Sequence, residues 1–251
     1  MSDVVLRELR DGVAFLRMNR PEKRNAFNRE LSLAVATQME ELEADDDVRV
    51  VVLTGTDPSF SAGADMTEAL SSIEGGGRGD GMAQAVVRVA AFAKPVIAAV
   101  NGYAFGGGAI LALSCDIRIG SEKTSFRFPG AAYGLVVGGG QLPRIVGAPK
   151  AKELIFTART VDAQEAERIG LVNQLVPHEA LDDAAWEMAQ QIAQQSPGAV
   201  RWSKAVIDAA STVEKGAQVE LEANRALRGT DDHITRFRDA THRVAGPTKR
   251  E

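Results

Sequence analysis

The stretch that decides the fold is Pro95-Val96-Ile97-Ala98-Ala99-Val100-Asn101-Gly102-Tyr103-Ala104-Phe105-Gly106-Gly107-Gly108, with Ala109-Ile110-Leu111-Ala112-Leu113 directly after it. An apolar run of strand character enters a glycine turn, and an apolar helical segment follows the turn. Glycine allows backbone N–H groups to approach a ligand closely, and the start of a helix carries partial positive charge. The pattern therefore predicts a buried strand, a turn and a helix whose first N–H groups can hold an oxyanion.

A second stretch has the same construction about forty residues earlier. The apolar run Val48–Leu53 and the turn Thr54-Gly55-Thr56-Asp57-Pro58 precede Phe60-Ser61-Ala62-Gly63-Ala64-Asp65-Met66. Between the predicted strands Val13–Met18 and Val48–Leu53, Asn28 is a plausible helix cap, and one helical face then carries Leu31, Val35, Met39 and Leu42. The alternation of strand and helix predicts an α/β fold.

Together the two stretches resemble the crotonase superfamily, which is the enoyl-CoA hydratase/isomerase family. Further blocks of the chain are similar to that family in the same order, and the similarity spans roughly residues 13 to 177. These blocks are Asn19–Phe27, Lys94–Val100, Cys115-Asp116, Asp162–Ala166 and Gly170–Val172.

The resemblance implies a spiral of repeated ββα units that forms two packed sheets, followed by a helical module. We therefore expect an α/β core over residues 1–177 and a helical C-terminal oligomerisation module over residues 178–251, where helical spacing is seen from Leu181 and again from Val213 to Leu227. In the family such a module packs subunits into trimers, often paired into hexamers. Residues Ser71–Gly81, which are rich in glycine, are expected to form a surface loop.

The resemblance also implies an oxyanion hole made of two backbone N–H groups, those of Ala64 and Gly107, which grip the carbonyl oxygen of a CoA thioester. The family's hydratases add two glutamates that move protons. At the matching positions this chain has Ile110 and, after Phe128-Pro129, Gly130, and neither residue can transfer a proton. We expect hydratase activity to be severely reduced unless other groups substitute.

Several side chains near these positions are candidates for the site. Tyr133 and Glu68 are possible replacements for the missing acid–base groups, although a packed aromatic ring and a solvated carboxylate explain them equally simply. Ala62 and Asp65 flank the first donor, and Asp65 is expected to cap the following helix.

Coenzyme A would enter as part of the substrate, with no further cofactor. By resemblance, Lys23 and Arg24 contact its phosphates and Phe237 covers its nucleotide. Ordinary surface charge explains the two basic residues equally well. Ile110 and Gly130 are expected to shape the acyl pocket.

Three functions stay open. The first is an acyl-CoA lyase or isomerase of the family, for example in fatty acid metabolism, with an unusual proton-transfer set. The second is a catalytically silent acyl-CoA-binding protein. The third is an acyl-CoA decarboxylase or thioester hydrolase.

The composition disfavours several classes of binding partner. A net charge of −5 disfavours nucleic acid and anionic membranes, no metal-ligand spacing occurs, and no apolar run approaches the roughly 20 residues of a membrane span. A cytoplasmic location is expected, because the N-terminus has no signal-peptide pattern.

Overall fold

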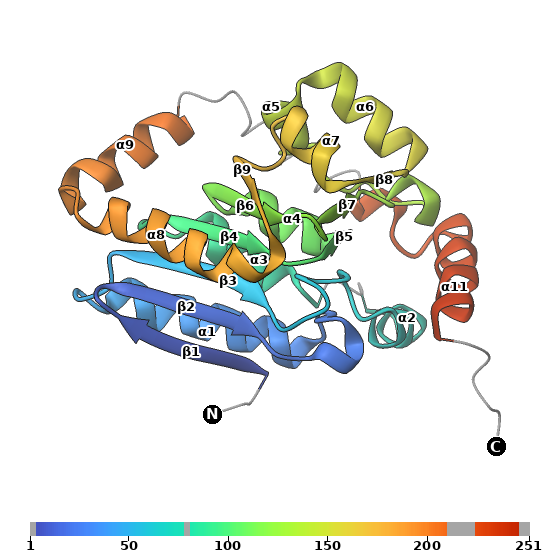
Figure 1. Ribbon diagram of the computed structural model, residues 1–251. Coiled ribbons are helices and arrows are strands. Elements are labelled where there is room, and N and C mark those ends of the chain that lie inside the picture. The colour runs from blue at the N-terminus through green and yellow to red at the C-terminus, as the bar shows by residue number, and fades with distance from the viewer. Residues whose placement is uncertain (1–3, 78–80, 210–223, 246–251) are drawn as a thin grey trace.

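The main sheet forms the centre of the molecule. The computed structural model describes residues 4–77, 81–209 and 224–245 (Figure 1). The strand order is β1-β2-β3-β4-β6-β9; β1 pairs antiparallel with β2, and the other neighbours are parallel. The strands are β1 Val5–Arg10, β2 Val13–Met18, β3 Val50–Gly55, β4 Val96–Val100, β6 Ile117–Ser121 and β9 Gln174–Val176.

Strand β4 is apolar throughout and β3 is apolar from Val50 to Leu53, as expected for strands covered by helices on both faces of the sheet. Val51 and Leu53 belong to the core shared with α1 (Arg29–Ala44) and α3 (Ala83–Ala90). Val50 and Val52 alternate with them and pack on the other side, in the core shared with α8 (Leu181–Ala193). Figure 1 shows α8 lying across this second face of the sheet.

Helix α1 forms as the sequence predicts. The Asn28 side chain accepts a hydrogen bond from the Leu31 N–H and so caps the helix at its start. The predicted apolar face is buried, and its members are Leu31, Val35, Met39 and Leu42.

A second, three-stranded sheet has the order β5-β7-β8 and lies beside the glycine turn. Its strands are β5 Tyr103–Phe105, β7 Ser125–Arg127 and β8 Thr160–Val161. Helix α4 (Gly107–Ser114) begins inside the turn, as predicted. Around this sheet lie α5 Leu142–Val146, α6 Ala148–Thr157 and α7 Ala163–Arg168, and the 3-10 turns of the chain are η1 Pro21–Lys23, η2 Ala131–Tyr133 and η3 His178–Ala180.

The expected loop at Ser71–Gly81 is wrong in its first part. Helix α2 (Met66–Glu74) runs through residues 71–74 and ends only where the glycines begin, because Ala69 and Ile73 have an apolar cluster to pack against. Residues 78–80 lie outside the described part of the chain.

After Pro177 the described residues form helices, in agreement with the predicted helical C-terminal part. These are α8, α9 (Pro197–Ala209) and α11 (Asp231–Ala245). Helix α8 packs on the main sheet, and α11 packs on α2. The helical pattern predicted from Val213 lies outside the described residues as far as residue 223. In the described ranges, none of the helices has the length and apolar character that a membrane crossing needs.

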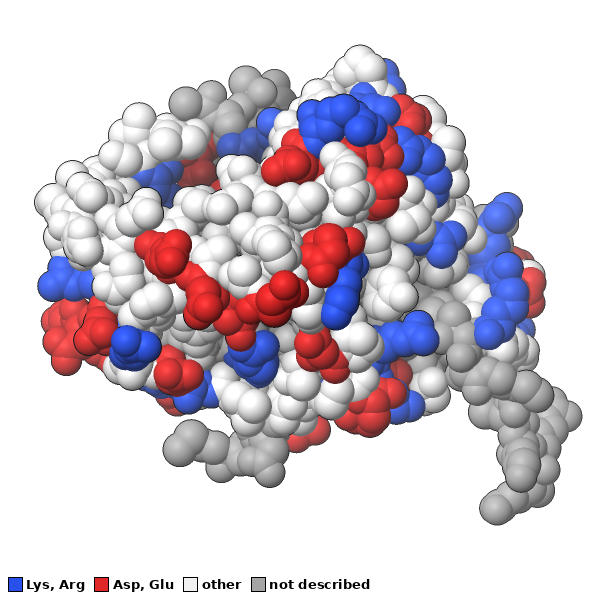
Figure 2. Space-filling view, viewed as in Figure 1, with Lys and Arg blue, Asp and Glu red and all other residues white. Residues whose placement is uncertain are grey.

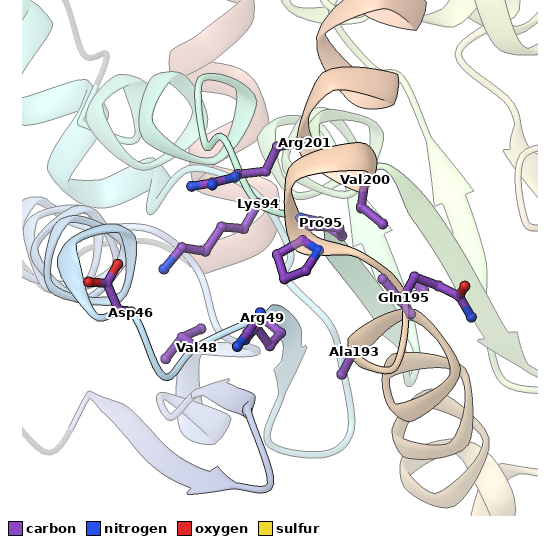
Figure 3. A pocket seen from close by; sticks show the side chains of 11 residues that line it. Asp46, Val48, Arg49, Lys94, Pro95, Ala193, Gln195, Val200 and Arg201 are labelled. Atoms are coloured by element: carbon purple, nitrogen blue, oxygen red, sulfur yellow. The ribbon is translucent and has the colours of Figure 1, made fainter.

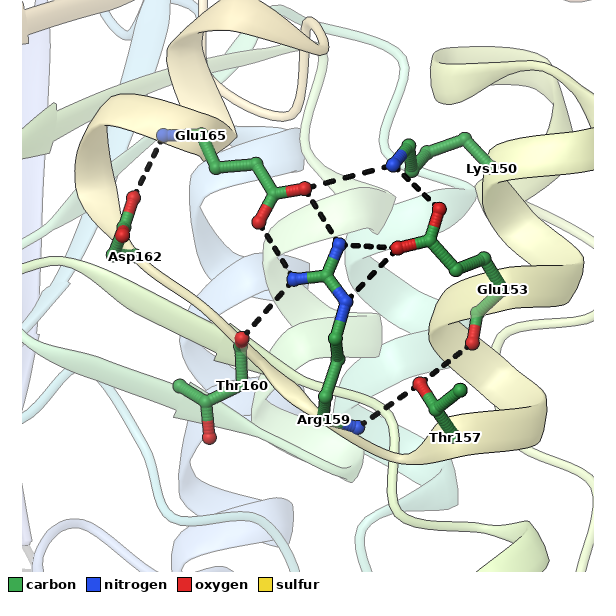
Figure 4. Close-up of polar contacts among 7 residues, drawn as sticks. All are labelled: Lys150, Glu153, Thr157, Arg159, Thr160, Asp162 and Glu165. Carbon is green, nitrogen blue, oxygen red and sulfur yellow. Dashed lines mark hydrogen bonds and ion pairs between the residues drawn. The ribbon is translucent and has the colours of Figure 1, made fainter.

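An ion-pair cluster joins α6, β8 and α7, and Figure 4 shows it. The Arg159 guanidinium binds Glu165 through both terminal nitrogens, at 2.6 Å each, and binds Glu153 through Nε at 2.9 Å. Asp162 caps α7 by accepting a hydrogen bond from the Glu165 N–H at 2.8 Å. The Asp162–Ala166 block of the sequence therefore fixes a helix start and places a carboxylate on Arg159.

Glu165→Gln tests this cluster. Hydrogen bonds from Arg159 lower the pKa of the Glu165 carboxyl to about 2 from its usual 4.5. Because the folded-state pKa is lowered, the stabilisation is present above about pH 4.5 and is lost as the pH falls toward 2. We expect the variant to lose about 1 kcal/mol of unfolding free energy at pH 7 and to show a shallower decline between pH 4.5 and 3 in urea titrations.

The matched control is Glu187→Gln. Glu187 is exposed on α8 and makes no ion pair within the part of the chain that the structure describes. The control should follow the wild-type curve at every pH. Identical pH dependence in wild type and Glu165→Gln would contradict the role given to the cluster.

Candidate active site

The two glycine-containing stretches leave the sheet at the same edge. Strands β3 and β4 are adjacent and parallel, with Val51 opposite Val96, so their carboxyl ends lie side by side. The chain after β3 continues to Ala64, and the chain after β4 continues to Gly107. In open parallel sheets, ligands bind outside the carboxyl ends of the strands.

Short backbone bridges align these two stretches. Ser61 pairs with Ala104: the Ser61 N–H donates to Tyr103 O at 2.8 Å, and the Phe105 N–H donates to Ser61 O at 3.0 Å. Phe27 pairs with Ala64 in the same way, because its N–H donates to Gly63 O and its carbonyl accepts from the Asp65 N–H. The residues on both sides of Ala64 are thus held while its own N–H points away from the bridge.

The two candidate donors lie close together and are not used by the protein. A Cβ added to Gly63, which has φ +96°, would lie 3.2 Å from Gly107 N and 2.6 Å from Phe105 O. Gly107 is the first residue of α4, so its N–H has no partner inside the helix. Across the described ranges, neither the Ala64 N–H nor the Gly107 N–H donates a hydrogen bond.

Asn25 holds the first stretch in place, which explains the early Asn19–Phe27 block. Asn25 is fully buried with φ +53°. Its amide nitrogen donates to Thr56 O at 2.7 Å and to Ser59 O at 2.6 Å, while its carbonyl accepts from the Ser61 hydroxyl at 2.8 Å. A single side chain therefore satisfies the backbone of the turn that leads to Ala64.

Asp65 caps α2, as predicted. Its carboxylate accepts from the Glu68 N–H and also forms an ion pair with Arg20 at 3.3 Å, in which both side chains are 13% exposed. Arg20 in addition donates to Ala26 O. Because its carboxylate is paired with Arg20, Asp65 is held in place directly after Ala64. On the other side, Ala62 is held by donating its N–H to Arg24 O at 2.9 Å.

Glu68 makes a hydrogen bond that supports the fold. Its carboxylate accepts a hydrogen bond from the Arg29 N–H at 2.9 Å and so supports the start of α1. The side chain is exposed, and a role for Glu68 in proton transfer stays a prediction.

Tyr133 and Phe237 come together in the structure. Their rings meet edge to face with centroids 6.2 Å apart, in a cluster that includes Ala69 and Ile73 of α2. Phe237 is 6% exposed. Phe237 therefore packs α11 against α2, and its contact with a nucleotide stays a prediction.

The two positions that would carry glutamates differ in their surroundings. Ile110 is partly buried, and its Cδ1 lies 3.4 Å from the position of a Cβ on Gly138. Gly130 is enclosed: a Cβ there would lie 2.8 Å from both Leu135 O and Val137 N. The backbone of residues 135–137 therefore fills the space that a longer side chain at Gly130 would need.

Basic residues lie at the rim of the site. Lys23 and Arg24 are exposed at the end of η1, and the Arg24 guanidinium lies 5.8 Å from the ring centre of Tyr103. Figure 2 shows a band of acidic side chains on the face where α8 lies. Because α8 and the turn before it carry Glu179, Asp182, Asp183 and Glu187, an anionic ligand would be repelled there and attracted toward η1.

Met82 is a residue that the sequence did not indicate. It precedes α3, and its sulfur occupies the position that a Cβ on Gly107 would take. Only a glycine at residue 107 leaves room for this contact. The signal was absent because Met82 follows a glycine-rich stretch without any periodicity.

A hollow of about 150 Å³ lies at the opposite end of β3 and β4 (Figure 3). Arg49 and Lys94, which precede these two strands, line it together with Arg201 of α9. The Lys94 ammonium is already bound to Leu42 O and Asp45 O. Since the candidate donors follow the carboxyl ends of the strands, this hollow is separate from them.

In the described part of the chain, no group of three or more His, Cys, Asp or Glu side chains is placed to hold a metal ion.

Comparisons with known proteins agree with the fold. The family model "Enoyl-CoA hydratase/isomerase" matches residues 8–235. The chain is 42% identical to a short-chain-enoyl-CoA hydratase of Clostridium acetobutylicum over 90% of this chain and 87% of that protein. It is 33% identical to the 2,3-dehydroadipyl-CoA hydratase of Escherichia coli over 88% of each.

Two solved structures are similar throughout. An enoyl-CoA hydratase/isomerase from Pseudoalteromonas atlantica has a TM-score of 0.87 and 28% identity, covering 99% of this chain and 100% of that one. A monofunctional enoyl-CoA isomerase from M. smegmatis has a TM-score of 0.70 and 34% identity, covering 86% and 98%. The chain belongs to the enoyl-CoA hydratase/isomerase family, and the predicted crotonase-like α/β fold with a helical C-terminal part is confirmed.

Gly63→Ala tests the close approach of the two stretches. A Cβ at residue 63 meets the Phe105 carbonyl and also requires a left-handed backbone, so we expect a loss of about 2–5 kcal/mol of unfolding free energy in chemical denaturation.

Gly76→Ala is the control. Gly76 has φ +81° with no neighbour within 4 Å, so the variant carries the backbone strain without the clash and should lose only about 1–2 kcal/mol. Equal losses in the two variants would mean that the two stretches do not pack as tightly as described.

Proposed function

We propose that this protein binds an acyl-CoA thioester and stabilises negative charge on the thioester oxygen through the Ala64 and Gly107 N–H groups. The observation that carries the proposal is the pair of neighbouring backbone donors that the protein itself leaves unused. Removing the proton or carboxylate next to a thioester carbonyl produces an enolate, whose charge lies on that oxygen. Fixed donors in a partly buried site stabilise such charge more than water does.

Coenzyme A would enter as part of the substrate, and no separate cofactor is needed for this chemistry. Its phosphates would be attracted to Lys23 and Arg24, which are exposed and beside Ala62. Ile110 would contribute to the acyl pocket. The relatives named as short-chain enoyl-CoA and crotonyl-CoA hydratases favour a short acyl group.

The reaction that follows enolate formation depends on proton transfer, for which the candidates are few. Asp65 is paired with Arg20, Glu68 is bound to the Arg29 N–H, and Tyr133 is packed on Phe237. A neutral phenol with a pKa near 10 is a poor base at neutral pH. Decarboxylation of a malonyl-type CoA suits this arrangement, because the leaving carbon dioxide takes the place of the proton that a base would remove.

A silent acyl-CoA-binding protein is the second candidate. It is favoured by Ile110 and by the backbone of residues 135–137 filling the space beside Gly130. Mass spectrometry of products from crotonyl-CoA and methylmalonyl-CoA separates the candidates: hydration, loss of carbon dioxide, release of free CoA and no turnover each identify a different one.

Gly107→Pro removes the second donor directly. The first position of a helix accepts proline, because its N–H is not used within the helix. We expect turnover, or affinity for the acyl-CoA thioester if there is no turnover, to fall about 10²–10³-fold relative to wild type.

Gly107→Ala is the matched control, since it adds the same Cβ against Met82 and keeps the N–H. The ratio between the two variants reports the donor alone. If Pro and Ala at residue 107 have the same effect, the Gly107 N–H does not bind the thioester.

We also propose that the chain forms a homotrimer or a dimer of trimers through its C-terminal helices. Helix α9 exposes Trp202 (74%), Ile207 (66%) and Val206 (64%), and a hollow of about 540 Å³ lies between this helix and residues 90–93. Exposed apolar groups at this density are typical of a surface that another chain covers.

Val206→Glu/Ile207→Glu should reduce the mass measured by light scattering from at least three times the 26.7 kDa chain mass to a smaller species. Leu33→Glu, at a 53% exposed leucine of α1, is the control and should leave the mass unchanged. A monomeric wild-type protein would refute the assembly.

A further inference from the structure

Four residues close a hydrogen-bonded ring at the carboxyl edge of the main sheet, three of them through their side chains alone and Asn101 through its side-chain amide and its backbone carbonyl. Asn101 Nδ2 donates to Asp57 Oδ1 at 2.8 Å, and Asp57 Oδ2 lies 3.0 Å from His178 Nε2. His178 Nδ1 lies 3.2 Å from the Ser121 hydroxyl, which is 3.5 Å from Asn101 O. The ring joins the segments that follow β3, β4 and β6 to the turn before α8.

This ring connects the beginnings of the two segments that lead to the candidate donors. Asp57 precedes Ala64 by seven residues, and Asn101 precedes Gly107 by six. The residue after Asn101 is also tightly fixed, because a Cβ on Gly102 would overlap Pro58 O, and Gly102 O accepts from the Ser125 N–H at 3.2 Å. The ring is therefore linked to both candidate donors by short segments of paired backbone.

The ring has two hydrogen-bonding states that differ by one proton. The Asp57 carboxylate only accepts, so His178 carries a proton on Nε2. In the neutral imidazole, Nδ1 then accepts from the Ser121 hydroxyl. When the imidazole takes up a second proton, Nδ1 donates to Ser121 Oγ, and the hydroxyl proton is free to turn to Asn101 O. Ser121 has a single hydroxyl proton, so the two bonds exclude each other.

We propose that His178 is a positioning residue of the Ala64/Gly107 site, and that its protonation moves the Ser121 hydrogen bond onto Asn101 and so shifts the glycine turn. The proposal rests on the proposed function only in assigning these two N–H groups as donors. The ring and its two states stand on the geometry of the described residues.

Charged groups surround the His178–Asp57 pair. Lys123 acts on Asp57 from the segment after β6, Glu179 and Asp182 belong to the segment of His178, and Asp182 is paired with Arg17 of β2. Burial alone would raise the pKa of the Asp57 carboxyl, but hydrogen bonds from Asn101 and His178 outweigh burial and hold that pKa below its usual value. Asp57 thus stays an anion beside the imidazole.

The test follows the amide signals of Gly106 and Gly107 by NMR from pH 5 to 8 in the full chain, without any substrate. In wild type we expect these amides to show one transition whose midpoint matches that of the His178 ring. In His178→Gln, which retains a donor toward Asp57, the transition should vanish from both amides. His242→Gln is the control, because His242 is exposed on α11, and it should keep the wild-type transition.

Asp57→Asn provides a second, nearly isosteric variant. It removes the anion beside the imidazole, so the transition at Gly107 should move to lower pH. The proposal is overturned if the transition persists in His178→Gln, if it keeps its midpoint in Asp57→Asn, or if the His178 ring titrates while Gly107 does not respond. Because this NMR test uses no acyl-CoA, its result does not depend on the proposed activity. A failure of the proposed activity would show instead in the mass spectrometry of products.

Discussion

The Ala64 and Gly107 N–H groups lie close together and donate to no other group in the described residues, and the local structure is arranged around this pair. An unpaired buried donor is costly, so every neighbouring group has to be held by something else. The residues beside Ala64 are bonded to Phe27, and those before Gly107 are bonded to Ser61 and Arg127. Asn25 satisfies the turn that leads to Ala64 with one buried amide. Rigidity is thus supplied by the neighbours of the donors, which remain free for a ligand.

Two glycines beside the donors are also required, because their neighbours leave no room for a side chain. The Gly63 position leaves no room for a Cβ beside Phe105 O, and Gly107 leaves none beside the Met82 sulfur. These glycines are required by contact distances more than by flexibility, since each is surrounded by paired backbone. The main sheet contributes by bringing the carboxyl ends of β3 and β4 to one edge, with apolar residues packed on both faces so that the edge cannot shift.

The sequence allowed the α/β class, helix α1 and the start of α4 to be predicted, because apolar periodicity and turn glycines are local signals. The family resemblance added the spiral fold, which periodicity alone does not specify. The end of α2 was missed because packing of Ala69 and Ile73 outweighs the weak helical character of Ser71 and Ser72. Met82 and the ring around His178 were missed for a different reason: they arise from contacts between residues far apart in the chain, which no local pattern records.

The position of Gly130 bears most directly on what the site can do. If the chain had only lost a carboxylate there, a cavity would remain where water could enter and act. The backbone of residues 135–137 occupies that space instead, so the loop is packed for the absence of a side chain. If the Ala64 and Gly107 N–H groups bind a thioester oxygen, as we propose, the site stabilises an oxyanion but has no room at Gly130 for a carboxylate side chain. Such a site would favour chemistry in which charge develops on that oxygen without a carboxylate base, so similarity to hydratases does not by itself assign hydration to this chain.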